Sequence, residues 1–217
     1  MADQAQVNNN FLEKNKPVIF GGVLLIIAVA VFALVVGGGS EKKNIIAADE
    51  MFKAQSYFER DSFALALNGV QTPGAVQVDG FLQIIDKYSG SESANLAHYY
   101  AGICFLNLGQ FQDAVSFLEN YKGKDLYTPA MALIALGDAK SELNDMAGAK
   151  AAYEKAVKTN ANEATSPLAL HKLAQLAEHE GKKDEAKSYL EKIQQEYTAY
   201  AESALISQDL IRITNTY

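Results

Sequence analysis

The pattern of apolar and polar residues divides the chain into two unlike parts. Residues 17–36 form a run of twenty residues without a charge, whereas the chain after Lys43 mixes small, apolar and polar residues with a helical period. No window of this second part shows the strict alternation of a half-buried strand, and proline is scarce there. The pattern therefore predicts one apolar helix followed by an all-α domain.

The apolar run has three interpretations: a cleaved secretory signal, a retained transmembrane helix, or a buried core helix. At about 1.5 Å per residue it reaches roughly 30 Å, which is the thickness of a bilayer's hydrocarbon core. A secretory signal has a shorter apolar region behind a compact basic leader, whereas this leader is sixteen residues long and contains Asp3 and Glu13. A core helix would show an amphipathic stripe, and the run is apolar on every face. We expect a transmembrane helix, although the glycines at 37–39 also supply the small residues that a signal peptidase needs.

Positive residues flank the run on both sides. Lys14 and Lys16 precede it, and Lys42 and Lys43 follow it. Because the two sides are nearly balanced, the positive-inside rule does not decide the orientation of the predicted transmembrane helix.

The remaining sequence contains a repeated helix pair, whose first and second members we call the A helix and the B helix. The B helices align on small residues at spacings of 34, 35 and 37, namely Gly80, Ala114, Ala149 and Ala186. The A helices align on Gly102, Gly137 and Ala174, preceded at a fixed distance by His98, Leu133 and Leu170. Small residues let paired helices approach closely, and we expect the bulky side chains beside them to fill the remaining space: Phe105, Leu118, Tyr153 and Leu190.

Two signals predict where the helices begin and end. Gly109, Asn144 and Gly181 stand between A and B helices, where a left-handed residue ends a helix and where Gly or Asn is tolerated. Thr128-Pro129 and Ser166-Pro167 each predict a hydroxyl N-cap followed by proline at the first helical position.

The predicted organisation has six segments. The segment from Ile45 to Tyr88 matches a repeat whose A helix is lengthened by "YFERDSFALALNGVQTPGA", and Ala199 to Thr214 forms an amphipathic closing helix. The predicted boundaries are 1–16 for an N-terminal segment, 17–36 for the transmembrane helix, 37–44 for a tether, 45–90 for a divergent first repeat, 91–198 for three repeats, and 199–217 for a capping helix and tail.

Composition narrows the class of protein. Apolar residues make up 49% and charged residues 21% of 217 residues, which is typical of a folded chain. The net charge of -7 argues against nucleic-acid binding, which depends on Lys and Arg neutralising phosphates. A single cysteine, Cys104, excludes an internal disulfide, and its apolar neighbours predict a buried, unreactive thiol.

Candidate catalytic and metal-binding residues are few. The segment "GKKDEAK" at Gly181 lacks the upstream glycine and the following Ser or Thr of a phosphate loop. His171 and His179 lie eight residues apart, about 12 Å along a helix, which is too far for both to bind one metal ion. No nucleophile, base and orienting acid can be assembled either. The sequence therefore predicts no catalytic residue, no cofactor and no metal.

Surface shape is the remaining basis for a function. In stacked helix pairs the A helices line a concave face, where protein segments bind. The predicted partner-binding residues are Tyr99, Ile103, Leu106, Asn107, Ile134, Asp138, Ser141, Glu142, His171 and Gln175, with Glu178 and His179 completing the last row. The alternative is that Tyr99 and Ile103 only pack against the closing helix or the first repeat.

These repeats resemble the tetratricopeptide repeat, a 34-residue helix-turn-helix with a small residue in helix A, a Gly near the turn, and an Ala and an aromatic in helix B. Repeat domains of this class that clamp a carboxylate tail use Lys, Asn and Arg in the groove. The row predicted here is apolar at one end and polar to acidic at the other, so such a partner is not expected.

The order of one apolar span followed by "ERDSFALALNG", "GFLQIIDKY", "NLAHYYAGICFLNLGQFQDAVSFL" and "ALGDAKSEL" is similar to single-span tetratricopeptide-repeat proteins of Bacteroidota-type bacteria, which are organised like the YfgM family. The resemblance implies an inner-membrane protein with a cytoplasmic N-terminus and a periplasmic repeat domain. It also implies partners of the protein-export system: translocon subunits of the Sec channel, a periplasmic chaperone or isomerase, or a nascent secreted protein.

Two functional hypotheses follow, from different classes. The first is a membrane-anchored adaptor that binds protein partners through its repeats. The second is a homo-oligomeric envelope scaffold, in cell division or in envelope maintenance like that of Tol-Pal-associated repeat proteins. An enzyme ranks third.

Overall fold

The structure is a computed structural model that describes residues 41–71, 74 and 76–215. It divides into two compact units, 1–46 and 47–217, and the fold below is that of the second unit. The described residues of this unit are helices joined by short connections, with a single antiparallel bridge between Val70 and Val78. The predicted all-α fold is confirmed for these residues.

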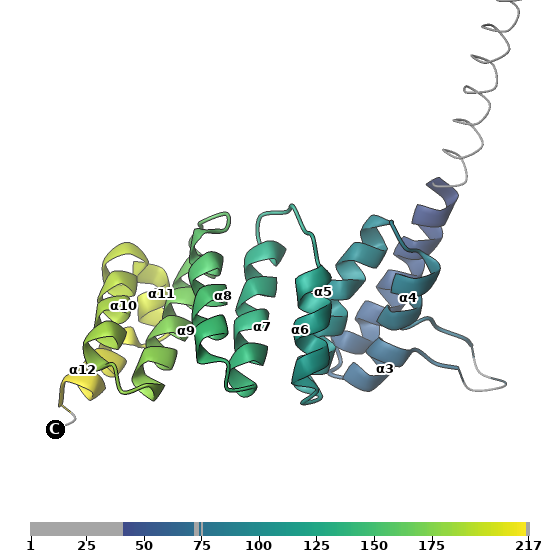
Figure 1. The fold of residues 1–217 in the computed structure, drawn as a ribbon. Helices are drawn as coiled ribbons and strands as arrows, with labels where there is room; N and C mark the ends of the chain where they lie inside the picture. The colour runs from purple at the N-terminus through teal and green to yellow at the C-terminus, as the bar shows by residue number, and fades with distance from the viewer. Residues whose placement is uncertain (1–40, 72–73, 75, 216–217) are drawn as a thin grey trace, which may run out of the picture. The chain divides into compact units, whose positions relative to one another are not determined.

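Six helices form three consecutive antiparallel pairs (Figure 1). Each helix packs against the next, and the A helices also pack against one another, α5 on α7 and α7 on α9. The pairs therefore stack as an α-solenoid. The A helices are α5 (Glu92–Asn107), α7 (Thr128–Glu142) and α9 (Thr165–His179), and the B helices are α6 (Phe111–Asn120), α8 (Met146–Lys158) and α10 (Lys183–Glu196).

The first repeat departs from the predicted arrangement. Its A helix is not lengthened: the helix ends at residue 58, and Asp61 turns the chain with a φ of 55°. The inserted residues form the short helix α3 (Phe63–Asn68) and the bridge, before α4 (Phe81–Lys87) takes the place of helix B. Both α3 and α4 pack against α5. The insertion thus covers the first end of the stack.

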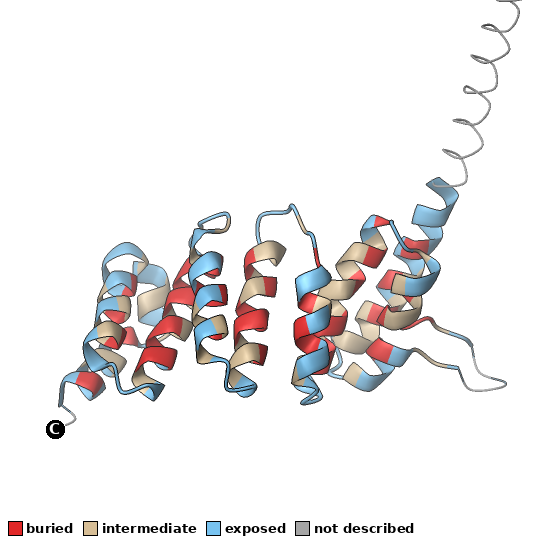
Figure 2. Ribbon diagram, in the orientation of Figure 1, coloured by how far each residue is buried: buried red, intermediate tan, exposed pale blue. Residues whose placement is uncertain are grey.

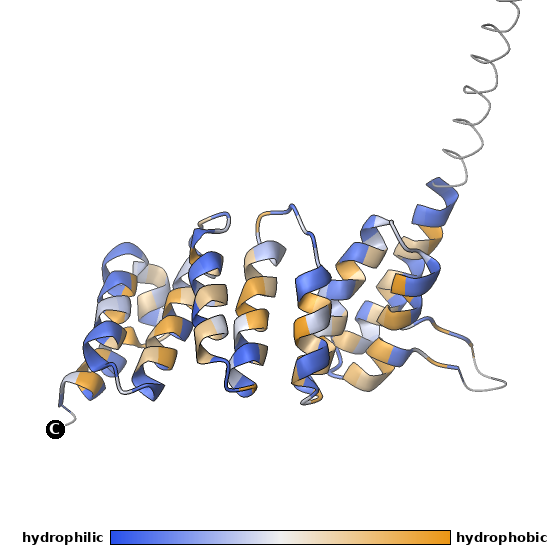
Figure 3. Ribbon diagram, in the orientation of Figure 1, coloured by the Kyte–Doolittle hydropathy of each residue, from blue (hydrophilic) through white to orange (hydrophobic). Residues whose placement is uncertain are grey.

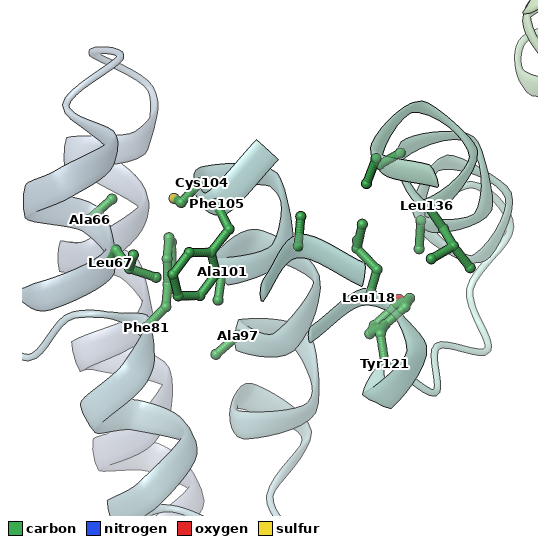
Figure 4. Packing of buried hydrophobic residues seen from close by; sticks show 14 of the residues in the cluster. Ala66, Leu67, Phe81, Ala97, Ala101, Cys104, Phe105, Leu118, Tyr121 and Leu136 are labelled. Atoms are coloured by element: carbon green, nitrogen blue, oxygen red, sulfur yellow. The ribbon is translucent and has the colours of Figure 1, made fainter. Parts of the chain in front are cut away.

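Small residues set the distance between paired helices, as predicted. A Cβ atom on Gly102 would lie 2.5 Å from Cγ of Leu118, and one on Gly137 would lie 2.3 Å from Cε1 of Tyr153. Buried residues line the facing sides of the helices, whose outer sides are polar (Figures 2 and 3). Figure 4 shows this packing around Phe105. Its side chain lies in the first hydrophobic cluster, which is formed mainly by buried residues of the first repeat and of α5, α6 and α7.

The turns between A and B helices also follow the prediction. Gly109, Asn144 and Gly181 have φ values of 73°, 60° and 74°. In each turn the next backbone N–H donates back to a carbonyl five residues earlier, as from Gln110 to Phe105 at 2.8 Å. This is the Schellman arrangement that satisfies carbonyls at a helix end.

The predicted hydroxyl N-caps are wrong. Helix α7 starts at Thr128 itself, and Asp125 Oδ1 accepts hydrogen bonds from the N–H groups of Tyr127 at 3.0 Å and Thr128 at 2.7 Å. Helix α9 starts at Thr165, where Asn162 Oδ1 accepts from the N–H groups of Ala164 and Thr165. The side chains of Asp125 and Asn162 therefore accept from the N–H groups at the two helix starts, in place of the hydroxyls of Thr128 and Ser166.

The closing segment forms two helices where one was expected. Helix α11 (Thr198–Ser203) is followed by Leu205, whose φ of 54° lies in the left-handed region, and α12 (Ile206–Asn215) then turns back onto α10. This break lets Ile206 and Ile213 both enter the core, at 0% and 7% exposure. Burial of these two side chains offsets a backbone conformation that leucine disfavours.

The segments predicted at 1–16 and 17–36, and residues 37–40 of the tether, lie outside the described residues. Among the residues that the structure describes, none of the helices combines the length and the apolar character needed to cross a bilayer.

Candidate functional site

A groove runs along the C-terminal halves of the three A helices and has a volume of about 640 Å³. We call it the A-helix groove. It forms there because α5, α7 and α9 pack side by side. Its lining residues that the sequence predicted are Leu106, Asn107, Asp138, Ser141, Glu142, Gln175 and His179.

A polar network forms part of the groove lining. Asp138 Oδ1 accepts a hydrogen bond from the hydroxyl of Tyr153 at 2.7 Å. The same oxygen forms an ion pair with Lys172 Nζ at 2.8 Å. The phenol of Tyr153 is buried, and burial together with the neighbouring Asp138 carboxylate raises its pKa well above the usual value. The tyrosine therefore stays a neutral donor, and Asp138 is held in place from two helices.

The ends of the groove differ in polarity. Leu106 and Phe111 contribute half-buried apolar surface at the α5 end. Glu142, Gln175 and His179 are exposed at the α7 and α9 side, so their polar atoms are available to a bound molecule. Such a surface can hold an apolar side chain at one end and hydrogen-bond a peptide along the rest.

Five lining residues are not among those that the sequence predicted for the surface: Gly109, Phe111, Tyr153, Lys172 and Leu176. Phe111 and Tyr153 belong to B helices, which were not expected to reach the groove. One signal was available for Tyr153, because a phenol stands at a position that carries leucine in the neighbouring repeats, Leu118 and Leu190. A hydroxyl there needs a polar partner, and Asp138 is that partner.

Two residues predicted at the α5 end of the binding surface pack against the core. Tyr99 and Ile103 are half-buried and pack against the first hydrophobic cluster, which contains residues of the divergent first repeat. The Tyr99 ring lies 5.2 Å from Tyr100 and 5.6 Å from Tyr121, and burial raises its pKa to about 12. The packing interpretation of these two residues is therefore the one that the structure favours.

Three further predicted residues lie away from the groove. Ile134 is only 4% exposed, because α7 is enclosed by neighbours on both sides. It packs in a second hydrophobic cluster, formed mainly by buried residues of α8, α9, α10 and α12. His171 Nδ1 lies 3.1 Å from the hydroxyl of Tyr200 on α11, and Glu178 pairs with Arg212 on α12. The closing helices thus cover the α9 end of the predicted row.

Cys104 is fully buried as predicted, and burial raises the pKa of its thiol to about 12, so it stays protonated and unreactive. Within residues 41–71, 74 and 76–215, no three His, Cys, Asp or Glu side chains cluster closely enough to hold a metal ion.

Comparison with known families identifies the repeats. Residues 97–204 match a family model described as a tetratricopeptide repeat-like domain. The match spans α6 to α11 and most of α5, and it includes every residue that lines the A-helix groove. No curated protein matches the chain. The tetratricopeptide-type repeats predicted from the sequence are therefore confirmed over this range, and the resemblance to the YfgM family stays a prediction.

Proposed function

We propose that the chain is a membrane-anchored adaptor that binds protein partners through the A-helix groove, next to the Sec translocon and periplasmic chaperones. A tetratricopeptide repeat-like domain is in general a protein-interaction module, which supports the adaptor role. The membrane anchor and the periplasmic site of action rest on the sequence.

The observation that carries the proposal is the groove itself. Three successive A helices contribute to one continuous surface, and its polar part is held by Asp138, Tyr153 and Lys172 rather than by mobile side chains. A surface that is already ordered loses less conformational entropy when a partner binds. The exposed Asn107, Glu142 and Gln175 lie along it and contribute specificity.

The groove suits an extended or helical protein segment. Its apolar end at Leu106 and Phe111 accepts one anchor side chain, and its remaining length offers carboxylate and amide groups. In the groove lining, Lys172 is engaged by Asp138. A partner segment held mainly by its C-terminal carboxylate would need unengaged cations here, so recognition by an anchor side chain is the better fit.

The proposed location follows from the first part of the sequence. Residues 17–36 have the length and uniform apolarity of a transmembrane helix. Residues 41–44 of the predicted tether are helical, so the limited freedom of the repeat domain near the bilayer is proposed to come from the three glycines at 37–39. The resemblance to YfgM-type proteins supports a periplasmic repeat domain. In spheroplasts, external protease is then expected to digest the repeat domain, and full protection would contradict the proposed orientation.

The partner is tested by co-purification from membranes after chemical crosslinking. The variant Glu142→Arg with Gln175→Arg changes two exposed groove residues, and Glu154→Arg with Gln195→Arg makes the same changes on the exposed sides of α8 and α10. The amount of translocon subunit or periplasmic chaperone that co-purifies with the groove variant is expected to fall by at least about tenfold. A charge that is buried or reversed at an interface costs about 1.4 kcal/mol or more, which corresponds to tenfold in affinity. The control variant is expected to retain it.

Two outcomes would contradict the proposal. One is the absence of any export component from the purified complex. The other is a self-associating chain whose oligomers depend on the groove, which is the result that the envelope-scaffold hypothesis predicts.

A further inference from the structure

A second cavity, of about 530 Å³, lies on the other side of α7 from the A-helix groove. It is enclosed by the end of α6, the N-terminal half of α7 and the end of α8. Leu136 lines this cavity and Asp138 lines the groove. Residues two positions apart on an α-helix point about 200° apart around its axis. The two sites therefore open in different directions, and both can be occupied in one molecule.

The floor of this cavity is apolar. It is formed by Leu118 on α6, by Tyr121 directly after α6, and by Leu133 and Leu136 on α7. Leu118, Tyr121 and Leu136 are labelled in Figure 4. Leu133 is half-buried and Leu136 is 9% exposed.

The same positions are more deeply buried in the next repeat. Leu170 and Leu173, which correspond to Leu133 and Leu136, are each 2% exposed. On the B helix, the fully buried Ile193 of α10 corresponds to the smaller Ala156 of α8. The apolar floor on α7 is therefore a local departure from the repeat.

The rim of the cavity is basic, although the chain carries a net charge of -7. Lys122, Lys124 and Lys155 line it, and the one acidic residue there, Glu119, pairs with Lys140 at 3.1 Å. Among the described residues, Lys124 and Lys155 have no ion-pair partner. Lys155 lies in the last turn of α8, where the helix dipole favours a positive charge. This reason does not apply to Lys122 and Lys124, which lie in the loop after α6.

The loop that carries these two lysines is held in place. Lys122 N–H donates to Asn95 Oδ1 at 2.9 Å, and Asn160 Nδ2 donates to the Asp125 carbonyl at 2.8 Å. Burial alone would raise the pKa of Asp125, but hydrogen bonds from Thr128, Tyr127 and Tyr121 outweigh it and lower the pKa to about 2. The Asp125 carboxylate therefore stays charged and keeps the loop ordered.

We propose that this lysine-rimmed pocket docks an acidic amphipathic segment of a partner protein. An aliphatic side chain of the segment contacts Leu133 and Leu136, and carboxylates beside it meet Lys124 and Lys155. The basic, ordered rim complements the charge of such a segment, and the apolar floor accepts its aliphatic side chain. It does not depend on the proposed function, because the groove and the pocket share no lining residue.

The test uses the purified full chain and short fluorescein-labelled peptides, followed by fluorescence anisotropy. The first peptide has leucines flanked by glutamates, the second has lysines in place of the glutamates, and the third has serines in place of the leucines. The first is expected to bind at least about tenfold more tightly than either of the others, and more weakly as salt is added.

Variants locate the binding on the surface. Lys124→Glu with Lys155→Glu is expected to weaken the first peptide about tenfold or more. Lys158→Glu with Lys192→Glu makes the same change in net charge at exposed residues outside the pocket and is expected to have little effect. Glu142→Arg with Gln175→Arg in the groove is expected not to weaken binding, so failure of this inference and failure of the proposed function can be told apart.

Three results would overturn the inference: no binding of the glutamate peptide, equal binding of the lysine peptide, or equal loss in the pocket and control variants. A concentration-dependent dimer that Lys124→Glu with Lys155→Glu abolishes would assign the pocket to a second copy of this chain and would overturn it as well.

Discussion

His98 is a polar residue at a position where the other A helices carry leucine, at 133 and 170. Its Nδ1 atom is buried and has no hydrogen-bond partner among the described residues, and its ring lies 5.7 Å from that of Phe117. Burial lowers the pKa of His98, because the charged imidazolium is poorly solvated there. The residue thus costs stability and makes it depend on pH.

Replacing His98 with leucine is expected to raise the free energy of unfolding by about 1 to 2 kcal/mol at pH 7, since it removes an unsatisfied buried group. The unfolded chain binds a proton near pH 6.5 while the folded chain resists it, so the wild type loses stability as the pH falls through this window. The gain from His98→Leu should therefore be larger at pH 5 than at pH 7.

Urea unfolding followed by helical circular dichroism at the two pH values measures this effect. The exposed His179, changed to Gln, is the control and should alter the free energy of unfolding by no more than about 0.5 kcal/mol. An identical gain from His98→Leu at both pH values would show that protonation of His98 does not affect folding. Some pH dependence should remain, because burial also lowers the pKa of His171 against the opposing effect of Asp209.

Gly137 tests the close approach of paired helices. A Cβ at this position would lie 2.3 Å from the Tyr153 ring, so Gly137→Ala is expected to destabilise the fold by about 1 to 3 kcal/mol. Adding Tyr153→Leu recreates the Ala174 and Leu190 pair of the next repeat and should recover part of the loss. Thermal unfolding of the two single variants and the double variant measures this coupling, and strictly additive effects would contradict the proposed contact.

At the scale of elements, the closing helix α12 depends on a few buried side chains. Ile206 is fully buried and Ile211, on the same helix, is 60% exposed. Ile206→Ala is expected to cost about 2 to 4 kcal/mol through the cavity that it leaves, whereas Ile211→Ala should change stability by no more than about 0.5 kcal/mol. Hydrogen exchange of α10 and α12 checks this, and equal protection in both variants would show that α12 does not stabilise the end of the stack.

The helix pairs and their turns could be predicted from the sequence because each carries its own local signal. Gly109 and Asn144 are the residues that tolerate a left-handed helix end, and Gly137 is the small residue that its partner Tyr153 requires. The N-caps could not be placed in the same way, because Asp125 competes with Thr128 three residues later and local sequence favours neither strongly enough. The break at Leu205 has no sequence signal, since it depends on burial of Ile206 and Ile213.

At the scale of the whole molecule, the candidate site could be predicted only in part. Residues near the C-terminal ends of the A helices, such as Asn107 and Gln175, follow from repeat geometry and do line the groove. His171 does not, because repeat geometry gives no information about where α11 and α12 fold back. Which rows of a repeat surface stay open is decided by the ends of the stack, and those ends are the least repetitive part of the sequence.

We propose that the A-helix groove binds a protein of the export system, and a photo-crosslinking amino acid placed at Gln175 in growing cells is the sharpest test. The control carries the same amino acid at the exposed Gln195 on α10. An adduct with a translocon subunit or a periplasmic chaperone is expected from position 175. It should be lost when Glu142→Arg is added and absent from position 195. Equal adducts from both positions, no adduct from either, or an adduct with a second copy of the chain would contradict it.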